Sequence, residues 1–278
     1  MMHGFIPPQR YYAYRSWPQI LAWPDKANTV ILLPVAAIEQ HGPHLPLAVD
    51  AVIVLGVLGN ALDRLADEVP CLCLPPLYYG KSDEHIRFPG TVTLSAETLL
   101  HTLNEIAESV YRAGFRKLAL VNGHGGQPQV IQIAAREARL RHGDFTVFPT
   151  FIWSVPHAGD ELVSRRETLY GIHAGALETA LLLALLPDSV DMSKAVCEFP
   201  HGVPEDGAIS MEGERAATQG FAWLTHDLTV SGVLGDATLA TREMGDSLLD
   251  SLGQGWARLI GEMVRFEQPA AGAGPLGA

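Results

Sequence analysis

The 278-residue chain is poor in charge, in cysteine and in long apolar runs, and each scarcity excludes a class of protein. Charged residues make up 18% of it, and 19 Lys and Arg face 31 Asp and Glu, a formal charge of −12. The basic residues form no dense run, so the cationic surface that binds nucleic acid or an anionic membrane is missing. We therefore expect neither of these partners.

Apolar runs are short as well. The longest strongly apolar stretch, from Ala180 to Leu186, falls far below the roughly 20 residues that span a bilayer. The first 17 residues, MMHGFIPPQRYYAYRSW, lack the apolar centre of a secretion signal. The three cysteines are an odd number and argue against a disulfide framework, so we expect a protein of the reducing cytoplasm.

Apolar residues overall are abundant, at 47% of the chain, and can bury a large core. Short apolar runs alternate with helical stretches. Strands are expected at residues 29–34, 70–74, 117–121 and 145–153. Helices are expected at 50–66 (amphipathic), 95–113, 128–141, 175–186 and 238–266. This alternation predicts an α/β fold with a mainly parallel sheet, whose site lies at the carboxyl ends of the strands.

The rest of the chain is less informative. Residues 200–237 are rich in glycine and acidic residues and show no clear pattern of helix or strand. We expect residues 1–267 to form a single domain and residues 268–278 to be a disordered tail.

The first group of chemically active residues directly follows the first expected strand. It places Glu39, His41, His44 and Asp50 on a loop that a glycine and two prolines stiffen. Glu39 and His41 are two residues apart, so an extended backbone projects both from one face. The alternative is a polar surface loop with Asp50 as a helix N-cap. The density of N and O ligands at a strand end favours a site for Zn²⁺ or Mn²⁺.

Two more groups follow later strands. In Asn122-Gly123-His124-Gly125-Gly126 the glycines form a tight turn that leaves His124 exposed in the cleft. In 173–179 (HAGALET), Glu178 lies in the first turns of an otherwise apolar helix, where a carboxylate is costly unless it is paired or bound to a metal. An ordinary turn and a glutamate satisfied by helix amides are the respective alternatives.

The fourth group is a candidate substrate loop after the second strand, reading YGKSDEH over 79–85 and FPGT over 88–91. Its candidate substrate contacts are Tyr79, Ser82, Glu84 and His85. A solvated charged loop is the alternative for Lys81 and Asp83.

These four blocks, in this order, resemble the creatininase (creatinine amidohydrolase) family over roughly residues 15–195. The resemblance implies a three-layer α/β/α fold. It also implies a metal-dependent hydrolase of C–N bonds in cyclic or linear amides, with a small-molecule amide as its partner and a homohexamer as its assembly.

The resemblance also implies roles for single residues. By motif position, Glu39, His41, Asp50 and His124 are metal ligands, and Asp50 bridges two divalent ions, Zn²⁺ or Mn²⁺. The family glutamate two residues after the histidine of the Asn-Gly-His block is replaced here by Gly126.

Other members with Asn-Gly-His-Gly-Gly use the glutamate of the later block, here Glu178, as a ligand or a base. His173 matches the family's proton-transfer histidine, and Trp153 matches a substrate-side tryptophan. A second such tryptophan is absent from the segment 168–171 (TLYG). Related members act on formamides, on a keto-inositol ring or on a peptide.

We therefore predict a hydrolase in which two ions activate a shared water. A non-catalytic protein that kept the metal pocket is one alternative. A serine or cysteine hydrolase is disfavoured because no serine or cysteine stands at a turn apex with a nearby histidine. An oxidoreductase is disfavoured because no G-x-G-x-x-G follows a strand.

Overall fold

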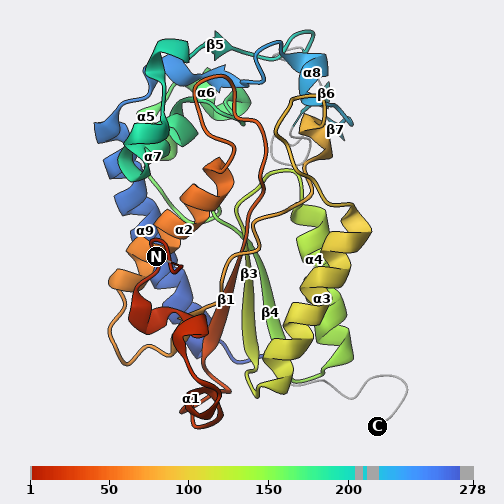
Figure 1. Ribbon diagram of the computed structural model, residues 1–278, viewed down its shortest axis with the longest axis vertical. Coiled ribbons are helices and arrows are strands. Elements are labelled where there is room, and N and C mark those ends of the chain that lie inside the picture. The colour runs from red at the N-terminus through yellow and green to blue at the C-terminus, as the bar shows by residue number, and fades with distance from the viewer. Residues whose placement is uncertain (1, 204–208, 212–218, 270–278) are drawn as a thin grey trace.

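A four-stranded parallel sheet forms the centre of the protein (Figure 1). The computed structural model describes residues 2–203, 209–211 and 219–269. The strands lie in the order β2-β1-β3-β4. Their bounds are Val30–Val35 (β1), Cys71–Cys73 (β2), Lys117–Asn122 (β3) and Thr146–Phe151 (β4). The predicted α/β class with a parallel sheet is confirmed.

Side chains of the inner strands alternate between two apolar cores. All six residues of β1 are buried. Val30 and Leu32 face one core, and Ile31 and Leu33 face the other. A strand that is buried on both faces reads as a continuous apolar run, which is why β1 was recognisable in the sequence.

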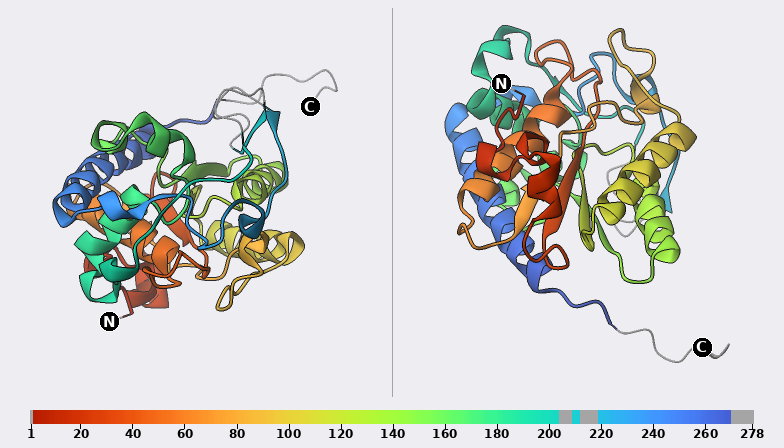
Figure 2. Two further views of the ribbon diagram at one scale, coloured as in Figure 1. Left: turned by 90° about the horizontal axis from the view of Figure 1, so that it is seen from above. Right: turned by 60° about the horizontal axis from the view of Figure 1, so that its bottom comes forward.

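Helices cover both faces of the sheet, so the predicted three-layer fold is confirmed (Figures 1 and 2). One layer holds α2 (Val49–Asp63), α7 (Ala176–Leu185) and α9 (Arg242–Arg265). The other holds α3 (Ala96–Arg112) and α4 (Pro128–Arg141). Within the first layer, α9 packs Gly245 directly on the Ala180 carbonyl of α7, where a larger residue would collide.

Helix α2 differs from its prediction. The sequence predicted an amphipathic helix, but 13 of its 15 residues are buried. The helix packs against α7 and α9, and the N-terminal arm covers it as well, since the Phe5 carbonyl lies against Gly59. The prediction of amphipathicity was wrong because this arm, distant in sequence, covers the side that would otherwise face solvent.

Short elements complete the described chain. They are α1 (Trp17–Leu21), α5 (Gly159–Leu162), α6 (Arg165–Tyr170), β5 (Cys197–Glu198), β6 (Ile209–Ser210), β7 (Gln219–Gly220), α8 (Thr225–Leu228) and β8 (Gly235–Asp236). Strand β8 pairs antiparallel with β5, which gives part of the unassigned segment a regular structure. Of the predicted tail, residues 270–278 lie outside the described residues.

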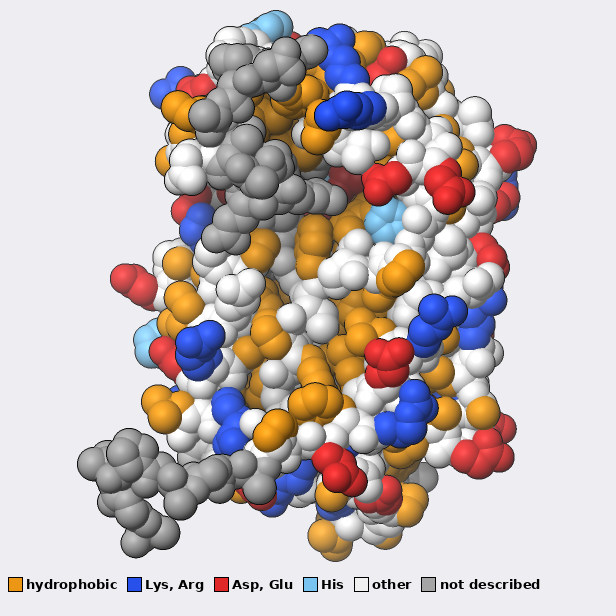
Figure 3. Space-filling view, turned by 180° about the vertical axis from the view of Figure 1, so that it is seen from behind, with side chains coloured by type: hydrophobic (Ala, Val, Ile, Leu, Met, Phe, Trp, Pro, Cys, Tyr) orange, Lys and Arg blue, Asp and Glu red, His pale blue; other side chains and the backbone are white. Residues whose placement is uncertain are grey.

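Three further observations concern the cysteines, the helices and the surface. All three cysteines are free, with Cys71 and Cys73 buried in β2 and Cys197 exposed. In the described part of the chain, no helix has both the length and the apolar character needed to cross a membrane. Apolar side chains gather in a hollow along the middle of the face turned away in Figure 1 (Figure 3).

Candidate metal centre

The loops that follow β1 and β3 are tied together at the carboxyl end of the sheet. The Gly123 N–H donates to the Val35 carbonyl at 2.8 Å. The buried Gln127 carboxamide donates to the Ala36 carbonyl at 3.2 Å and to Asn122 Oδ1 at 3.0 Å. These bonds fix the distance between the two loops, so the side chains that they carry meet at one place.

The turn at 122–126 holds His124 in a defined orientation. Asn122 accepts the His124 N–H at 3.1 Å and donates to the His124 carbonyl at 2.7 Å. His124 Nε2 lies 2.9 Å from the Lys81 carbonyl, which can only accept, so we assign the ring proton to Nε2. Nδ1 then faces the carboxylates of the cluster, and its lone pair is free when the ring is neutral.

Glu39 lies at the centre of the cluster and is fully buried. Its Oε1 atom is 3.2 Å from His124 Nδ1 and 3.5 Å from His85 Nε2. It is 3.7 Å from His173 Nδ1 and 3.8 Å from His41 Nε2. One carboxylate thus faces four imidazole rings that come from four separate segments of the chain.

Asp50 faces two sides of the cluster with its two oxygens. Its Oδ1 lies 3.6 Å from His41 Nε2, and its Oδ2 lies 3.3 Å from His124 Nδ1. Glu178 Oε2 lies 3.8 Å from His41 Nε2, on the Oδ1 side. Asp50 stands in the first turn of α2 and Glu178 in the first turn of α7, where helix dipoles favour negative charge.

The residues present fit divalent ions. Among the residues that the structure describes, both oxygens of Glu39, Nε2 of His41 and Oδ2 of Asp50 are buried without a hydrogen-bond partner. Such orphaned polar atoms are costly. N and O ligands of a tetrahedral ion stand about 3.3 Å apart. The separations of 3.2–3.8 Å between the carboxylates and imidazoles are close to that value.

A stack of three imidazole rings lies beside these carboxylates. His173 is sandwiched between His41 and His85, with ring centroids 4.2 and 4.1 Å apart. His173 Nε2 lies 2.7 Å from the backbone carbonyl of Gln40, so this nitrogen carries the proton and Nδ1 faces Glu39. The Gln40 carboxamide also donates to His85 Nδ1 at 2.8 Å, which holds the stack in place.

The environment of the two histidines nearest Asp50 favours their protonated, positively charged state. Burial alone would lower the pKa of His41, but the carboxylates of Asp50, Glu178 and Glu39 raise it to about 9. Burial also opposes protonation of His124, and again the carboxylates, Glu39 foremost, raise its pKa well above the usual value. Without ions, protons on these rings offset the negative charge, so cation binding must release them.

The pKa values of the other groups in the cluster shift in different directions. Burial and the neighbouring rings of His85 and His41 lower the pKa of His173 well below its usual value, which leaves it neutral. Burial raises the pKa of the Glu178 carboxyl to about 7. The histidines opposite Asp50 lower the pKa of Asp50 despite its burial.

The creatinine amidohydrolase family model (Creatininase) matches residues 13–260. The chain belongs to the creatininase family. It is 31% identical to the creatinine amidohydrolase of Pseudomonas putida, over 91% of this chain and 95% of that protein. It is 32% identical to the mycofactocin precursor peptide peptidase of Mycolicibacterium smegmatis, over 83% and 84% of the two chains.

Solved creatininase structures share this fold and hold metals. A crystal structure of creatinine amidohydrolase matches with a TM-score of 0.70 and 29% identity, over 93% of this chain and 99% of that one. A manganese form and a variant in a Zn-Zn form each match with a TM-score of 0.69 and 29% identity over 91% of this chain, covering 98% and 97% of theirs. The chain is therefore a metal-dependent hydrolase of this family.

Of the predicted substrate residues, the creatininase fold brings some to the cluster and leaves others apart. Ser82, Glu84 and His85 reach it, and Ser82 Oγ lies 3.3 Å from His124 Nε2. Tyr79 is half exposed. Trp153 packs against the core of the first helical layer with its ring edge-on to His157, so contact of these two residues with substrate stays a prediction.

Sequence reasoning gave no role to several residues that the structure places in the site. Gln40 lies inside the recognised block, so its position was a signal. The Thr225 hydroxyl donates to His85 Nδ1 at 2.9 Å, and the Gly232 carbonyl accepts from Gln40 at 3.0 Å. Both come from the unassigned segment, where no pattern marked them.

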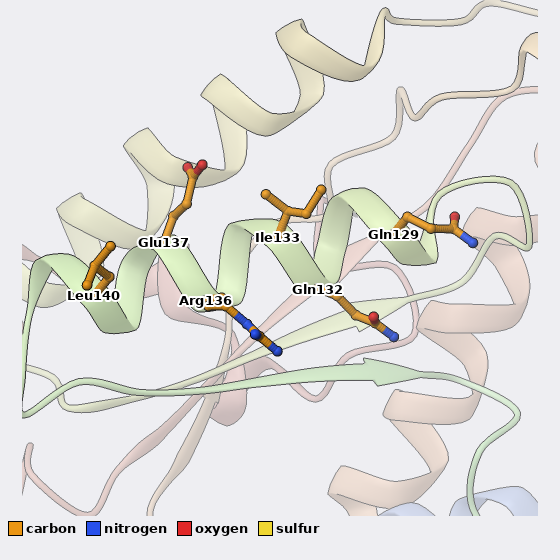
Figure 4. Close-up of a pocket in the computed structure, with 6 residues that line it drawn as sticks. All are labelled: Gln129, Gln132, Ile133, Arg136, Glu137 and Leu140. Atoms are coloured by element: carbon orange, nitrogen blue, oxygen red, sulfur yellow. The ribbon is translucent and has the colours of Figure 1, made fainter. Parts of the chain in front are cut away.

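A separate surface depression of about 430 Å³ lies along α4 (Figure 4). Its lining residues are Gln129, Gln132, Ile133, Arg136, Glu137 and Leu140. Its only carboxylate, Glu137, accepts a hydrogen bond from Asn104 at 2.6 Å. The chemistry of the family therefore belongs to the buried cluster and not to this depression.

Proposed function

We propose that this creatininase-family enzyme hydrolyses a C–N bond of a small cyclic or linear amide with two divalent ions, Zn²⁺ or Mn²⁺. One observation supports this above all others. The two oxygens of Asp50 face two different imidazoles, His41 on one side and His124 on the other. Asp50 would therefore be placed to hold two ions, one with each oxygen.

The ligand sets follow from the same contacts. His41 Nε2, Asp50 Oδ1 and Glu178 would hold the first ion, and His124 Nδ1, Asp50 Oδ2 and Glu39 the second. When bound, two ions of this kind lower the pKa of a water to about 7 and polarise a carbonyl oxygen. Glu178 is proposed as a ligand because its Oε2 faces His41.

His173 is the proposed proton carrier. Its Nε2 proton is anchored on the Gln40 carbonyl at 2.7 Å, so the free Nδ1 lone pair faces the cluster. Because its pKa is low, the ring is neutral and first accepts a proton from the attacking water at Nδ1. The same atom then delivers that proton to the leaving nitrogen, which is a poor leaving group unless protonated.

The substrate class follows from the relatives and remains a proposal here. The relatives of this chain include a creatinine amidohydrolase and a peptide peptidase. They also include a 3-dehydro-scyllo-inosose hydrolase of Thermotoga maritima, which is 31% identical over 82% of this chain and 76% of that protein. A panel of creatinine, formamides, lactams, inososes and short peptides would identify the substrate.

The first experiment measures metal content beside turnover of this panel, with and without chelator. We expect about two ions per chain and chelator-sensitive hydrolysis. Glu39→Gln should lose metal binding and hydrolysis, whereas the matched control Glu108→Gln should keep metal binding and hydrolysis. Glu108 lies on α3, and its carboxylate is 2.6 Å from the ring of His142, which follows α4, so this Glu–His pair belongs to the other helical layer. Turnover by metal-free protein would refute the proposal, and two ions without turnover would favour a binding protein.

We further propose a homo-oligomer, with a hexamer as the expected state, in the reducing cytoplasm. The apolar hollow in Figure 3 supports burial against other chains, and the free cysteines fit a reducing compartment. Analytical ultracentrifugation and fractionation of cells test the two statements separately.

A further inference from the structure

One partly exposed carboxylate, that of Glu198, anchors both ends of a segment that lies against the imidazole stack. Glu198 belongs to β5, and its main chain pairs with Gly235 of β8. Its carboxylate accepts the N–H groups of Val230 and Ser231, each at 2.8 Å, and also the Ser231 hydroxyl. The segment 230–235 is therefore fixed at its start by the side chain of Glu198 and at its end by the main chain of the same residue.

Between these two anchors the segment contacts the site at two points. The Gly232 carbonyl accepts a hydrogen bond from the Gln40 carboxamide at 3.0 Å. The Gly232 N–H donates to Thr229 Oγ1 at 2.8 Å, which fixes the orientation of this glycine. Leu234 and His173 exchange both of their main-chain hydrogen bonds, at 2.8 and 3.2 Å. The position of the segment thus determines where the Gln40 carboxamide and the main chain of His173 lie.

The Gln40 carboxamide carries this constraint to the rings. It donates to His85 Nδ1 at 2.8 Å, and the His85 ring stacks on that of His173 with centroids 4.1 Å apart. The carboxamide has no room to adjust on the other side, because an added Cβ at Gly232 would overlap it. A shift of the segment must therefore move the carboxamide and the rings that rest on it.

The contacts of Glu198 are directed mainly at this segment. Its other partner is the ring of His201, 3.2 Å away, whose side chain is 65% exposed. An exposed ion pair of this kind contributes little to stability. The three donors from Val230 and Ser231 engage both carboxylate oxygens, so the main consequence of the Glu198 side chain is the placement of the segment.

We propose that Glu198 is a positioning residue for His173, which it orients through the segment 230–235 and the Gln40 carboxamide. The inference rests on the proposed role of His173 as the proton carrier. A proton carrier must lie within hydrogen-bond reach of the reacting atoms, and a misplacement of about 1 Å can cost about 100-fold in rate.

The first test is the kinetics of Glu198→Gln in the Zn²⁺-loaded protein, with the member of the amide panel that the wild type hydrolyses. An amide has one acceptor oxygen, whereas Val230 and Ser231 donate to different oxygens of Glu198. We expect kcat to fall about 10- to 100-fold, with KM and the content of both ions unchanged. Ser231→Ala, which removes the hydroxyl contact, should show a smaller loss of the same kind.

His201→Gln is the matched control. It removes the exposed partner of the same carboxylate and leaves the hydrogen bonds to Val230 and Ser231 in place. This variant should keep the kcat of the wild type. Circular dichroism of each variant checks that it folds.

A double-mutant cycle with Gln40→Leu separates positioning from general support of the fold. If Glu198 acts through the carboxamide, Glu198→Gln should lower kcat by less than about twofold in the Gln40→Leu background. Its effect on the melting temperature should be the same in both backgrounds. A residue with a merely structural role would lower kcat by the same factor with and without the carboxamide.

A spectroscopic measurement tests the same path without substrate. In the Zn²⁺-loaded protein with ¹⁵N-labelled histidine, Glu198→Gln and Gln40→Leu should both shift the His85 Nδ1 resonance, because this atom loses or changes its donor. His201→Gln should leave that resonance in place. An unchanged His85 resonance in Glu198→Gln would overturn the inference, and so would equal kcat losses in the two backgrounds or the loss of an ion.

These outcomes are distinct from a failure of the proposed function. A Zn²⁺-loaded wild type that hydrolyses no member of the panel would count against the proposed function, and the His85 resonance would still decide whether Glu198 positions the rings. Normal turnover in the wild type with an unchanged kcat in Glu198→Gln would overturn the inference and leave the proposed function standing.

Discussion

Chelation should make the protein progressively less stable as the pH rises from 6.5 to about 9. In the ion-free chain, burial opposes the charge on His41, but Asp50, Glu178 and Glu39 raise its pKa to about 9 from the ordinary 6.5. A histidine with a raised pKa stabilises the fold fully below the unfolded value of 6.5. That contribution is lost as the pH rises through about 9.

The size of the effect follows from the shift. A difference of about 2.5 pKa units, at 1.36 kcal/mol each, corresponds to about 3 kcal/mol of unfolding free energy. At about 2 °C per kcal/mol for a chain of this size, the melting temperature should fall by about 6 °C. His124 acts in the same direction. So does Glu178, because a carboxyl with a pKa raised to about 7 costs stability as the pH rises from 4.5 to 7.

Bound ions should reverse this trend. They bind the deprotonated imidazole of His41, so their affinity rises with pH over the same range. Thermal unfolding with and without EDTA at pH 6.5 and 9 should therefore show a gap in melting temperature that widens by about 6 °C or more. In chelated His41→Gln the pH dependence should shrink. A gap that stays constant or narrows toward pH 9 would refute the reasoning.

Three further substitutions separate metal binding, proton transfer and structure. Glu39→Ala should lower kcat/KM at least about 100-fold with loss of metal, measured by turnover and elemental analysis. His173→Asn should keep both ions and lower kcat by roughly 10²–10⁴, and loss of an ion instead would show that this ring is a ligand. Glu167→Gln should cost about 1–3 kcal/mol in urea unfolding, since the Glu167 carboxylate accepts the N–H groups of Ala176 at 2.7 Å and Asp236 at 2.8 Å.

Local patterns were sufficient to predict most of the layers. Helix α4 has the predicted bounds of 128–141, and β3 extends one residue beyond the predicted 117–121. Both elements are bounded by local signals, a proline at the helix start and a glycine turn after the strand. The predicted amphipathicity of α2 was wrong because burial depends on what packs against a helix. The N-terminal arm that covers α2 is more than forty residues away in the sequence.

The candidate ligands were predictable for a related reason. Glu39, His41 and Asp50 lie on one short loop, and His124 on one tight turn, so spacing alone indicates that they converge. Glu84 could not be assigned a place beside His124 in this way. Its proximity depends on the glycine at 126 and on a loop that crosses from another strand, and neither is a local pattern.

The segment 229–235 shows why the remaining part of the site left no signal. Its path is set by polar contacts, since the Glu198 carboxylate accepts the N–H groups of Val230 and Ser231, each at 2.8 Å. Gly232 then adopts a left-handed φ of +84°, and any side chain there would collide with Gln40. Such polar contacts leave no periodic pattern in the sequence. The hydrogen bond between Gln40 and Gly232 joins residues more than 190 positions apart. The same glycine that looks like part of a featureless segment therefore positions the carboxamide that holds the imidazole stack.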